Sequence, residues 1–234
     1  MNPEICGMNV ALGWAMKGWF FKIPILFSCC YFFVGCAVSN NPLRKEIKQL
    51  QKGVIKDDTS FVYLLPFEND NSHLLVQGYF GIFSHKERAA LDFKMKRGTK
   101  LLAVRDGVVI RVKEDGSKGG WSSKYRSQGN NIVIQHIDNS RSGYWHLQKD
   151  GALVKVGDTV KQGQVIGLSG KTGYAAIPHL HFIVWSNDSR GRWQQVATRF
   201  QTSKGIKYLR PWKWYRNKTQ SSTNPSLTLE ATAQ

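Results

Sequence analysis

Short apolar runs separated by turn residues dominate the chain between residues 61 and 216. The runs of β-strand length are LLAV, GVVIRV, NNIVIQHI, SGYWHL, GQVIGLSG and HLHFIVW. Gly, Asp and Asn residues interrupt them, which is the pattern of strands joined by tight turns. No stretch of twelve or more residues shows convincing helical periodicity. The pattern predicts an all-β fold, arranged as a sandwich or a partly closed barrel.

A different pattern marks the N-terminus. Lys17 and Lys22 flank the start of an apolar run over residues 23–34. This run is short for a membrane span and has the length of the hydrophobic region of a signal peptide. We therefore predict a signal peptide over residues 1–35, with Met16 as a possible start.

The phrase FVGC, which ends this run, resembles a bacterial lipobox, in which the cysteine is lipidated and becomes the first mature residue. The resemblance implies a lipid on Cys36 and a place in the cell envelope. The residues after it carry no aspartate retention signal for the inner membrane, which favours the outer membrane or periplasm. The alternatives are cleavage after Ala37, giving a secreted or soluble periplasmic protein, and a retained single anchor. All three place the body outside the cytoplasm.

Polar segments lie on both sides of the strand-rich region. Residues 36–60 are polar and of mixed charge. A short helix could form there, but the apolar positions are sparse, and we predict a lipid-anchored tether. Residues 61–216 form the predicted domain. Residues 217–234 are rich in Ser and Thr with almost no large apolar residues, which predicts a disordered tail.

Charge and cysteine content narrow the chemistry of this domain. The net charge of +17 indicates an anionic partner. Nucleic acid is not indicated, because the chain has no Lys/Arg-rich helix and no zinc-finger spacing. The four cysteines all lie in the first forty residues. The domain therefore has neither a disulfide framework nor a thiolate metal site, and a metal there would be held by His, Asp or Glu.

His179 and His181 occupy alternate positions of the strand-like run HLHFIVW. Alternate residues of a strand project to one face, so both imidazoles would face one cleft while Leu180 and Phe182 point into the core. Asp92 lies in another strand-like run, AALDF. A hydrolytic zinc site needs three protein ligands and an open position for water. The alternative is a pair of surface histidines on an edge strand.

Several motifs follow one another in a characteristic order: GYFGIFSHKERAALDF, GTKLLAVRDGVV, GNNIVIQH, YWHL, VKVGDTVKQGQVIGLSGKTG and PHLHF. This series resembles the LytM/lysostaphin-type zinc endopeptidases, which cut peptide cross-links in bacterial peptidoglycan. The resemblance covers roughly residues 62–186. It implies a LytM-like β-sandwich or barrel-sandwich hybrid with an open groove, one Zn²⁺ ion, and endopeptidase activity on cross-links or stem peptides. The alternative is a non-catalytic regulator of this fold that activates other cell-wall hydrolases.

The same resemblance assigns roles to individual residues. The implied metal ligands are His85, Asp92 and His181. His146 and His179 would polarise the attacking water and stabilise the tetrahedral intermediate, and either could be the base. His85 and Asp92 are seven positions apart, farther than in many members of the family, which leaves the nearby Glu87 as an alternative ligand.

Other polar residues have structural interpretations. We predict that His136, at the end of a strand-like run, supports the structure through hydrogen bonds, and that His73 is a solvated loop residue. Strand alternation puts Tyr144 on the face of His146, where it would line the groove. The glycine-rich insertion at 114–129 is either a wall of that groove or an ordinary loop. The phrase LRPWKWYR is expected to pack as a last strand, with contact to glycan as the alternative.

Overall fold

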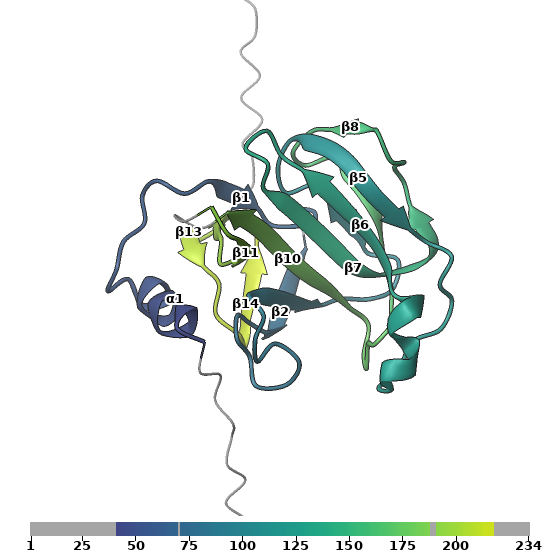
Figure 1. Cartoon of the computed structure of the whole chain (residues 1–234), viewed down its shortest axis with the longest axis horizontal. Helices are drawn as coiled ribbons and strands as arrows, with labels where there is room; N and C mark the ends of the chain where they lie inside the picture. The colour runs from purple at the N-terminus through teal and green to yellow at the C-terminus, as the bar shows by residue number, and fades with distance from the viewer. Residues whose placement is uncertain (1–40, 70, 188–190, 218–234) are drawn as a thin grey trace, which may run out of the picture. The chain divides into compact units, whose positions relative to one another are not determined.

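The computed structural model describes residues 41–69, 71–187 and 191–217 (Figure 1). The predicted signal peptide, Cys36 and all but the first residue of the predicted tail lie outside these ranges. Within them, no helix is long and apolar enough to cross a membrane.

Strands are the main regular element of the described chain, and helices are few and short, which confirms the all-β prediction. An 11-stranded sheet runs in the order β14, β2, β3, β10, β7, β6, β5, β8, with β11 beside β10, and with β9 between β4 and β7. The bounds of its strands are β2 Ser72–Gln77, β3 Ala90–Lys94, β4 Lys100–Leu102, β5 Gly107–Lys113, β6 Asn130–Gln135, β7 Arg141–Ala152, β8 Thr159–Val160, β9 Val165–Ser169, β10 His179–Asn187, β11 Trp193–Val196 and β14 Lys213–Arg216. A 3-stranded sheet joins β1 (Val62–Leu64), β12 (Arg199–Thr202) and β13 (Gly205–Tyr208).

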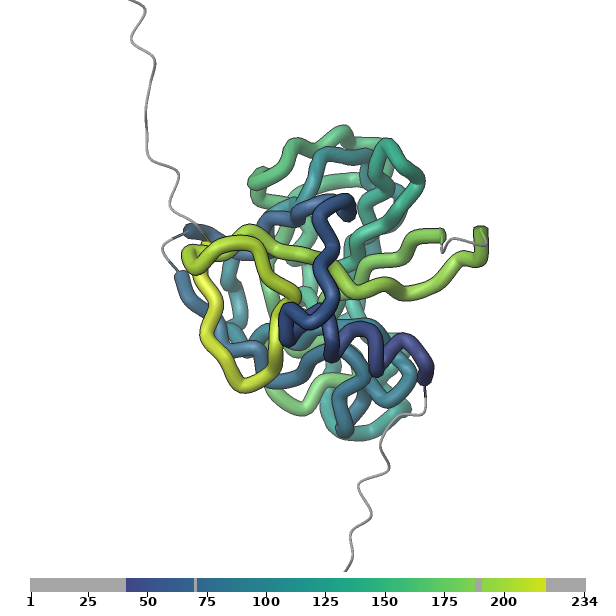
Figure 2. The backbone as a smooth tube through the Cα atoms, turned by 90° about the vertical axis from the view of Figure 1, so that its left-hand side faces the viewer, coloured from purple at the N-terminus to yellow at the C-terminus, as the bar shows by residue number. Residues whose placement is uncertain are grey.

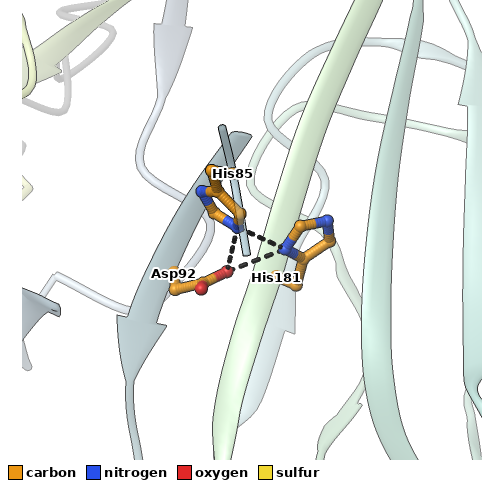
Figure 3. Close-up of side chains that lie close together, drawn as sticks. All are labelled: His85, Asp92 and His181. Atoms are coloured by element: carbon orange, nitrogen blue, oxygen red, sulfur yellow. Dashed lines mark hydrogen bonds and ion pairs between the residues drawn. The ribbon is translucent and has the colours of Figure 1, made fainter. Parts of the chain in front are cut away.

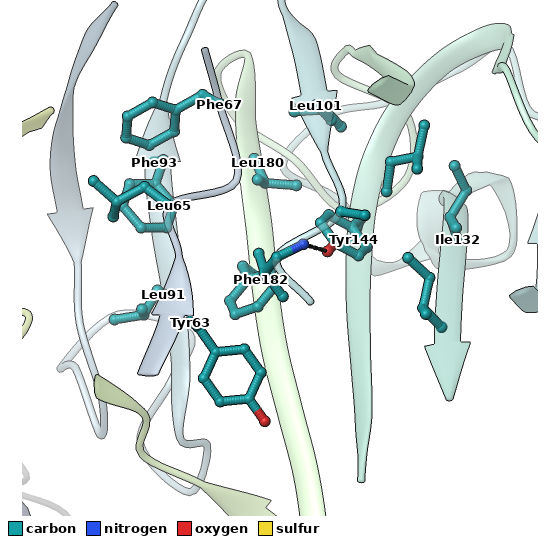
Figure 4. Packing of buried hydrophobic residues seen from close by; sticks show 14 of the residues in the cluster. Tyr63, Leu65, Phe67, Leu91, Phe93, Leu101, Ile132, Tyr144, Leu180 and Phe182 are labelled. Atoms are coloured by element: carbon teal, nitrogen blue, oxygen red, sulfur yellow. Dashed lines mark hydrogen bonds between the residues drawn. The ribbon is translucent and has the colours of Figure 1, made fainter. Parts of the chain in front are cut away.

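The hydrophobic core fixes which face of β10 is turned inward. Leu180 and Phe182 of this strand are 0% and 1% exposed, as the alternation pattern predicts. Figure 4 shows them among apolar side chains that include Leu91 and Phe93 of the adjacent strand β3 and Ile132 of β6. Because side chains alternate along a strand, burial of these two residues turns His179 and His181 to the opposite face.

Tyr144 corrects one expectation. Its side chain is completely buried in the core, where its hydroxyl accepts a hydrogen bond from the backbone N–H of Val104 at 2.9 Å (Figure 4). It therefore does not line a groove. The prediction assumed regular alternation, but His146 has a φ of 69°, in the left-handed region, and the pairing of β7 with β6 shifts across it, from Trp145 opposite Asn131 to Leu147 opposite Asn130. This irregularity breaks the shared face expected for Tyr144 and His146.

A helix, α1 (Leu43–Lys52), lies in the segment predicted to be a tether. Its Ile47 is 6% exposed and packs in a small cluster with Phe80 and Ala89. Gln51 Nε2 donates a hydrogen bond to the carbonyl of Leu209 at 2.5 Å. The apolar positions are sparse, as the sequence indicates, but Ile47 and the partly buried Leu43 pack one face of the short helix against this cluster. The predicted tether therefore includes a helix that packs on the domain.

We expect Ile47→Ala to lower the free energy of unfolding by about 2 kcal/mol, because it removes three carbons from a buried cluster. Urea denaturation would measure the change. The matched control is Val54→Ala, since Val54 is 69% exposed and its truncation should cost less than about 0.5 kcal/mol. Equal effects of the two substitutions would contradict docking of α1.

The C-terminal phrase forms β14, which pairs antiparallel with β2, so the prediction of a last packed strand is confirmed. Tyr215 of this strand is buried in the core. Asn217, placed in the predicted tail, is also buried, and its side-chain oxygen accepts the N–H of Leu65 at 3.0 Å. The packed structure therefore extends at least one residue beyond the predicted domain end.

Candidate metal centre

The outward face of β10 meets two neighbouring strands at His181. The register places His181 opposite Asp92 of β3 on one side and opposite Trp145 of β7 on the other. Cross-strand partners have closely spaced Cβ atoms, so the strand pairing itself brings the imidazole and the carboxylate together. His179 lies two residues earlier on the same face.

Three of the predicted site residues converge closely (Figure 3). Asp92 Oδ1 lies 2.7 Å from His181 Nδ1 and 3.1 Å from His85 Nε2, and the two ring nitrogens are 3.1 Å apart. All three side chains are buried. Asp92 follows His85 by 7 positions, and His181 follows Asp92 by 89 and His85 by 96, so the fold is needed to bring the three together.

Hydrogen bonding fixes the orientation of His85. Its Nδ1 lies 3.2 Å from the carbonyl oxygen of Gly78, and only a protonated nitrogen can donate there. In the neutral ring, Nε2 then carries a lone pair that faces the carboxylate oxygen of Asp92. Two facing lone pairs repel unless a cation lies between them. The buried donors are therefore arranged for a positive charge.

Electrostatics keep Asp92 ionised. Burial raises the pKa of its carboxyl group, but the imidazoles of His85 and His181, when they are protonated, outweigh burial through their charge and hydrogen bonds and hold the pKa well below the ordinary value. Gln77, at the end of β2, donates from Nε2 to the second carboxylate oxygen at 2.9 Å. Its side-chain oxygen accepts the N–H of Phe83 and of Ser84, both at 3.1 Å. Gln77 thus ties Asp92 to the loop that carries His85.

The donor set fits a metal ion. His85, Asp92 and His181 offer two nitrogens and one oxygen that all lie within 4.8 Å of one another. Donors about 2.0–2.2 Å from a tetrahedral zinc ion are separated by about 3.3–3.6 Å, a little more than the separations of 2.7–3.1 Å found here. The alternative ligand, Glu87, is exposed and is not part of this group.

His146 and His179 lie beside the cluster with their ring centroids 4.7 Å apart. The Nδ1 of His146 lies 2.7 Å from the carbonyl of Thr172, and the Nδ1 of His179 lies 2.8 Å from that of Ile177. Both Nδ1 atoms are therefore donors, which leaves each neutral ring an Nε2 lone pair. The Nε2 of His179 is 3.7 Å from Asp92 Oδ1.

Burial lowers the pKa of His146 to about 3, and the neighbouring rings of His179 and His181 add to the shift. His146 is therefore neutral at neutral pH, with an unprotonated Nε2. Sequence reasoning did not identify the residues that orient this group, namely Gln77 and the carbonyls of Thr172 and Ile177. Gln77 stands in the motif QGYFG, but nothing in its spacing indicates a partner fifteen positions away.

The insertion at 114–129 lies beside the loop at residues 172–173, whose Thr172 carbonyl accepts the hydrogen bond from the ring of His146. It contains a 3₁₀ helix, η1 (Ser123–Gln128). The N–H of Gly173 donates to the carbonyl of Lys118 at 2.9 Å, and Gly120 donates back to the carbonyl of Gly173 at 3.1 Å. Gly173 has a φ of 80°, and a Cβ there would lie 2.6 Å from the Cα of Gly129. The insertion thus packs tightly against the loop next to His146.

Comparisons with known proteins match this part of the chain. The model of Peptidase family M23 matches residues 86–192. ALE-1, a glycyl-glycine endopeptidase of Staphylococcus capitis, is 37% identical over 135 residues, which are 57% of this chain and 32% of that protein. The peptidoglycan DD-endopeptidase ShyA of Vibrio cholerae serotype O1 is 41% identical over 91 residues, which are 39% of this chain and 18% of that protein. These matches support the assignment of this chain to Peptidase family M23.

Among solved structures, the catalytic domain of lysostaphin from Staphylococcus simulans is 33% identical. The alignment covers 53% of this chain and 87% of that domain, with a TM-score of 0.38. The chain spans no more than a third of the length of ALE-1 or ShyA. The M23 match contains Asp92, His146, His179 and His181, whereas His85 lies one position before it.

The remaining histidines lie outside the cluster. His136 is buried, with Nδ1 2.8 Å from the carbonyl of Asp106 and Nε2 3.0 Å from the hydroxyl of Ser142, which agrees with its predicted supporting role. The prediction for His73 is wrong. His73 lies in β2, paired with Tyr215, and its Nδ1 is 3.1 Å from the carbonyl of Lys94. Pairing with β14, in which Tyr215 stands 142 positions after His73, makes this polar stretch a strand.

His136 predicts a pH dependence of stability. Burial, assisted by the charge of Arg105, lowers its pKa below the ordinary value of 6.5 despite the hydrogen bond to Asp106. Below about pH 6.5 the unfolded chain therefore binds a proton that the folded chain does not. The associated stability is complete above that pH and falls as the pH decreases towards the lower folded pKa.

Urea denaturation between about pH 7 and pH 5 would measure the fall in the free energy of unfolding. We expect a smaller slope in His136→Gln, which has no titrating ring, than in the wild type. An NMR titration should show a midpoint for His136 below that of a free imidazole. Identical pH slopes of the two proteins would contradict this assignment.

Proposed function

We propose that this chain is a zinc-dependent endopeptidase that cleaves peptide cross-links or stem peptides of bacterial peptidoglycan. The observation that carries the proposal is the convergence of His85, Asp92 and His181 beside two histidines whose Nε2 atoms are available. Support comes from the M23 match and from ALE-1 and ShyA, whose names describe endopeptidases.

In this proposal His85, Asp92 and His181 hold the ion. A bound zinc ion supplies Lewis acidity, which lowers the pKa of water and polarises a carbonyl group. His146 or His179 accepts the proton of the attacking water at Nε2. Once protonated, the same nitrogen can donate a hydrogen bond to the developing oxyanion or a proton to the leaving amine. The carbonyls of Thr172 and Ile177 keep both rings in the required tautomer.

A non-catalytic regulator of the same fold is the alternative. Such a protein has no need for a full set of metal donors or for two adjacent neutral imidazoles. The complete donor set therefore favours the enzyme.

Metal analysis combined with digestion of purified sacculi tests the proposal. We expect the full chain to contain about one zinc ion, to release soluble fragments with new amino termini, and to lose this activity on chelation and regain it with zinc. His181→Ala should lack both metal and activity. Glu87→Gln is the matched control and should keep both. Stoichiometric zinc without cleavage of any peptide bond would favour the regulator.

We also propose that the protein is anchored in the cell envelope through a lipid on Cys36, with the outer membrane or periplasm as its location. The support is the lipobox-like phrase FVGC, which lies outside the described residues. Labelling of cells with a palmitate analogue should mark the wild type and not Cys36→Ala. Equal labelling would exclude this anchor.

A further inference from the structure

A second concave surface lies away from the M23 match. It is a cleft of about 1170 Å³ between the C-terminal end of α1 with the segment that follows it, on one side, and β12, β13 and β14 on the other. Figure 2 shows α1 and the segment after it in purple and blue, close to the yellow-green C-terminal strands. The contact between Gln51 and Leu209 joins the two sides. We call this surface the basic cleft.

Cations dominate the lining of the basic cleft. Seven lysine and arginine side chains line it without an ion pair to any described residue: Lys52, Lys56, Lys204, Lys207, Arg210, Lys213 and Arg216. Six of them are exposed, and Arg210 is half-buried. Like charges that converge on one concave surface repel one another, so this arrangement favours an anionic occupant.

The carboxylates of the cleft do not neutralise these cations. Asp57 accepts hydrogen bonds from Ser60 and Tyr208 and lies beside Arg199, so it is used within the protein. Asp58 is the other carboxylate along the lining. Two acidic residues against eight basic ones, Arg199 included, leave the surface strongly positive.

An aromatic side chain accompanies the cations. In β14, Tyr215 points into the core, so alternation places Trp214 and Arg216 on the outward face. Trp214 lines the cleft and is 66% exposed. Exposure of much of an indole ring is unfavourable in water, and such a ring offers a flat apolar face for the ring of a sugar.

Strand β2 connects the basic cleft to the metal centre. Ser72, at one end of β2, lines the cleft, and Gln77, at the other end, hydrogen-bonds Asp92. Five residue steps at about 3.3 Å each place these two residues about 16 Å apart along the strand. This spacing suits the inference below that one extended polymer contacts both surfaces.

We infer that the basic cleft binds peptidoglycan at a second position, with stem-peptide carboxylates on its lysines and arginines and a sugar ring on Trp214. The identity of the polymer rests on the proposed function. A linear polymer can enter a concave cleft, whereas a flat membrane surface cannot. A second contact on the same polymer raises the effective concentration of substrate at the metal centre.

Charge-reversal variants of the metal-loaded full chain test this inference by co-sedimentation with purified sacculi. Lys204→Glu/Lys207→Glu alters the cleft. Arg111→Glu/Lys155→Glu is the matched control, because it changes the net charge equally at exposed sites on β5 and before β8, at the other end of the sheet from β14. We expect roughly tenfold weaker binding for the cleft variant and less than about twofold for the control. Trp214→Ala should weaken binding by about threefold or more.

Cleavage of a short cross-linked stem-peptide dimer separates this inference from the proposed function. The dimer is too short to reach the cleft, so all these variants should cleave it as the wild type does. If the wild type does not cleave the dimer, the result counts against the proposed endopeptidase activity, and the comparison of binding to sacculi still stands. If both charge-reversal variants bind sacculi equally weakly, or if neither binds more weakly than the wild type, the inference about the basic cleft is overturned. Vesicles of phosphatidylcholine with and without phosphatidylglycerol test the other occupant. If the cleft variant binds sacculi as the wild type does and loses binding only to the vesicles with phosphatidylglycerol, the occupant is a membrane and the inference is overturned.

Discussion

Asp92→Asn is expected to abolish metal binding and to reduce cleavage of sacculi by roughly a thousandfold or more, since Lewis-acid stabilisation of a transition state is worth several kcal/mol. Asparagine keeps the shape of the side chain but removes the charge. The carboxylate of Asp92 contacts both His85 and His181, at 3.1 and 2.7 Å, and is the only anion of the group. Without it, a divalent ion would meet two neutral imidazoles in a buried site, which disfavours binding of the ion.

Elemental analysis of purified protein, together with release of soluble fragments from sacculi, measures this effect. Asp115→Asn is the matched control, because Asp115 is an exposed carboxylate that pairs only with Lys113 among the described residues. It should retain both zinc and activity. Zinc retained at full affinity in Asp92→Asn would show that the ion is held elsewhere.

His146→Ala and His179→Ala are each expected to reduce cleavage by about a hundredfold to ten-thousandfold while the metal stays bound. Both rings present an Nε2 lone pair next to the cluster, but neither belongs to the group of three donors. Each substitution removes a proton acceptor and leaves the proposed ligands in place. Retained metal with lost activity distinguishes these residues from ligands.

Zinc content and thermal unfolding should be measured with activity in both variants. His73→Ala is a suitable control, because His73 lies in β2 with its Nδ1 on the carbonyl of Lys94 and contacts none of the site residues. It should keep both metal and activity. Unchanged cleavage in His146→Ala would remove that ring from the reaction, and loss of metal in His179→Ala would make His179 a ligand.

Local patterns in the sequence predict much of this architecture. Alternation along HLHFIVW predicts that Leu180 and Phe182 are buried and that both histidines share the opposite face, and the structure agrees. This works because a regular strand alternates with a fixed period of two. The same rule fails at Tyr144, because a left-handed residue at His146 interrupts the period.

The sequence by itself determined the all-β class, the absence of thiolate chemistry in the domain, and the set of residue types available for a metal. Tertiary structure alone decided which of those residues meet. The contacts of Asp92 with His181 and Gln77 follow from the pairing of β3 with β10 and β2, and the burial of Ile47 follows from the docking of α1. The physical reason is that strand register and helix docking depend on the summed burial of many distant side chains, whereas the periodicity of a strand depends only on the local backbone.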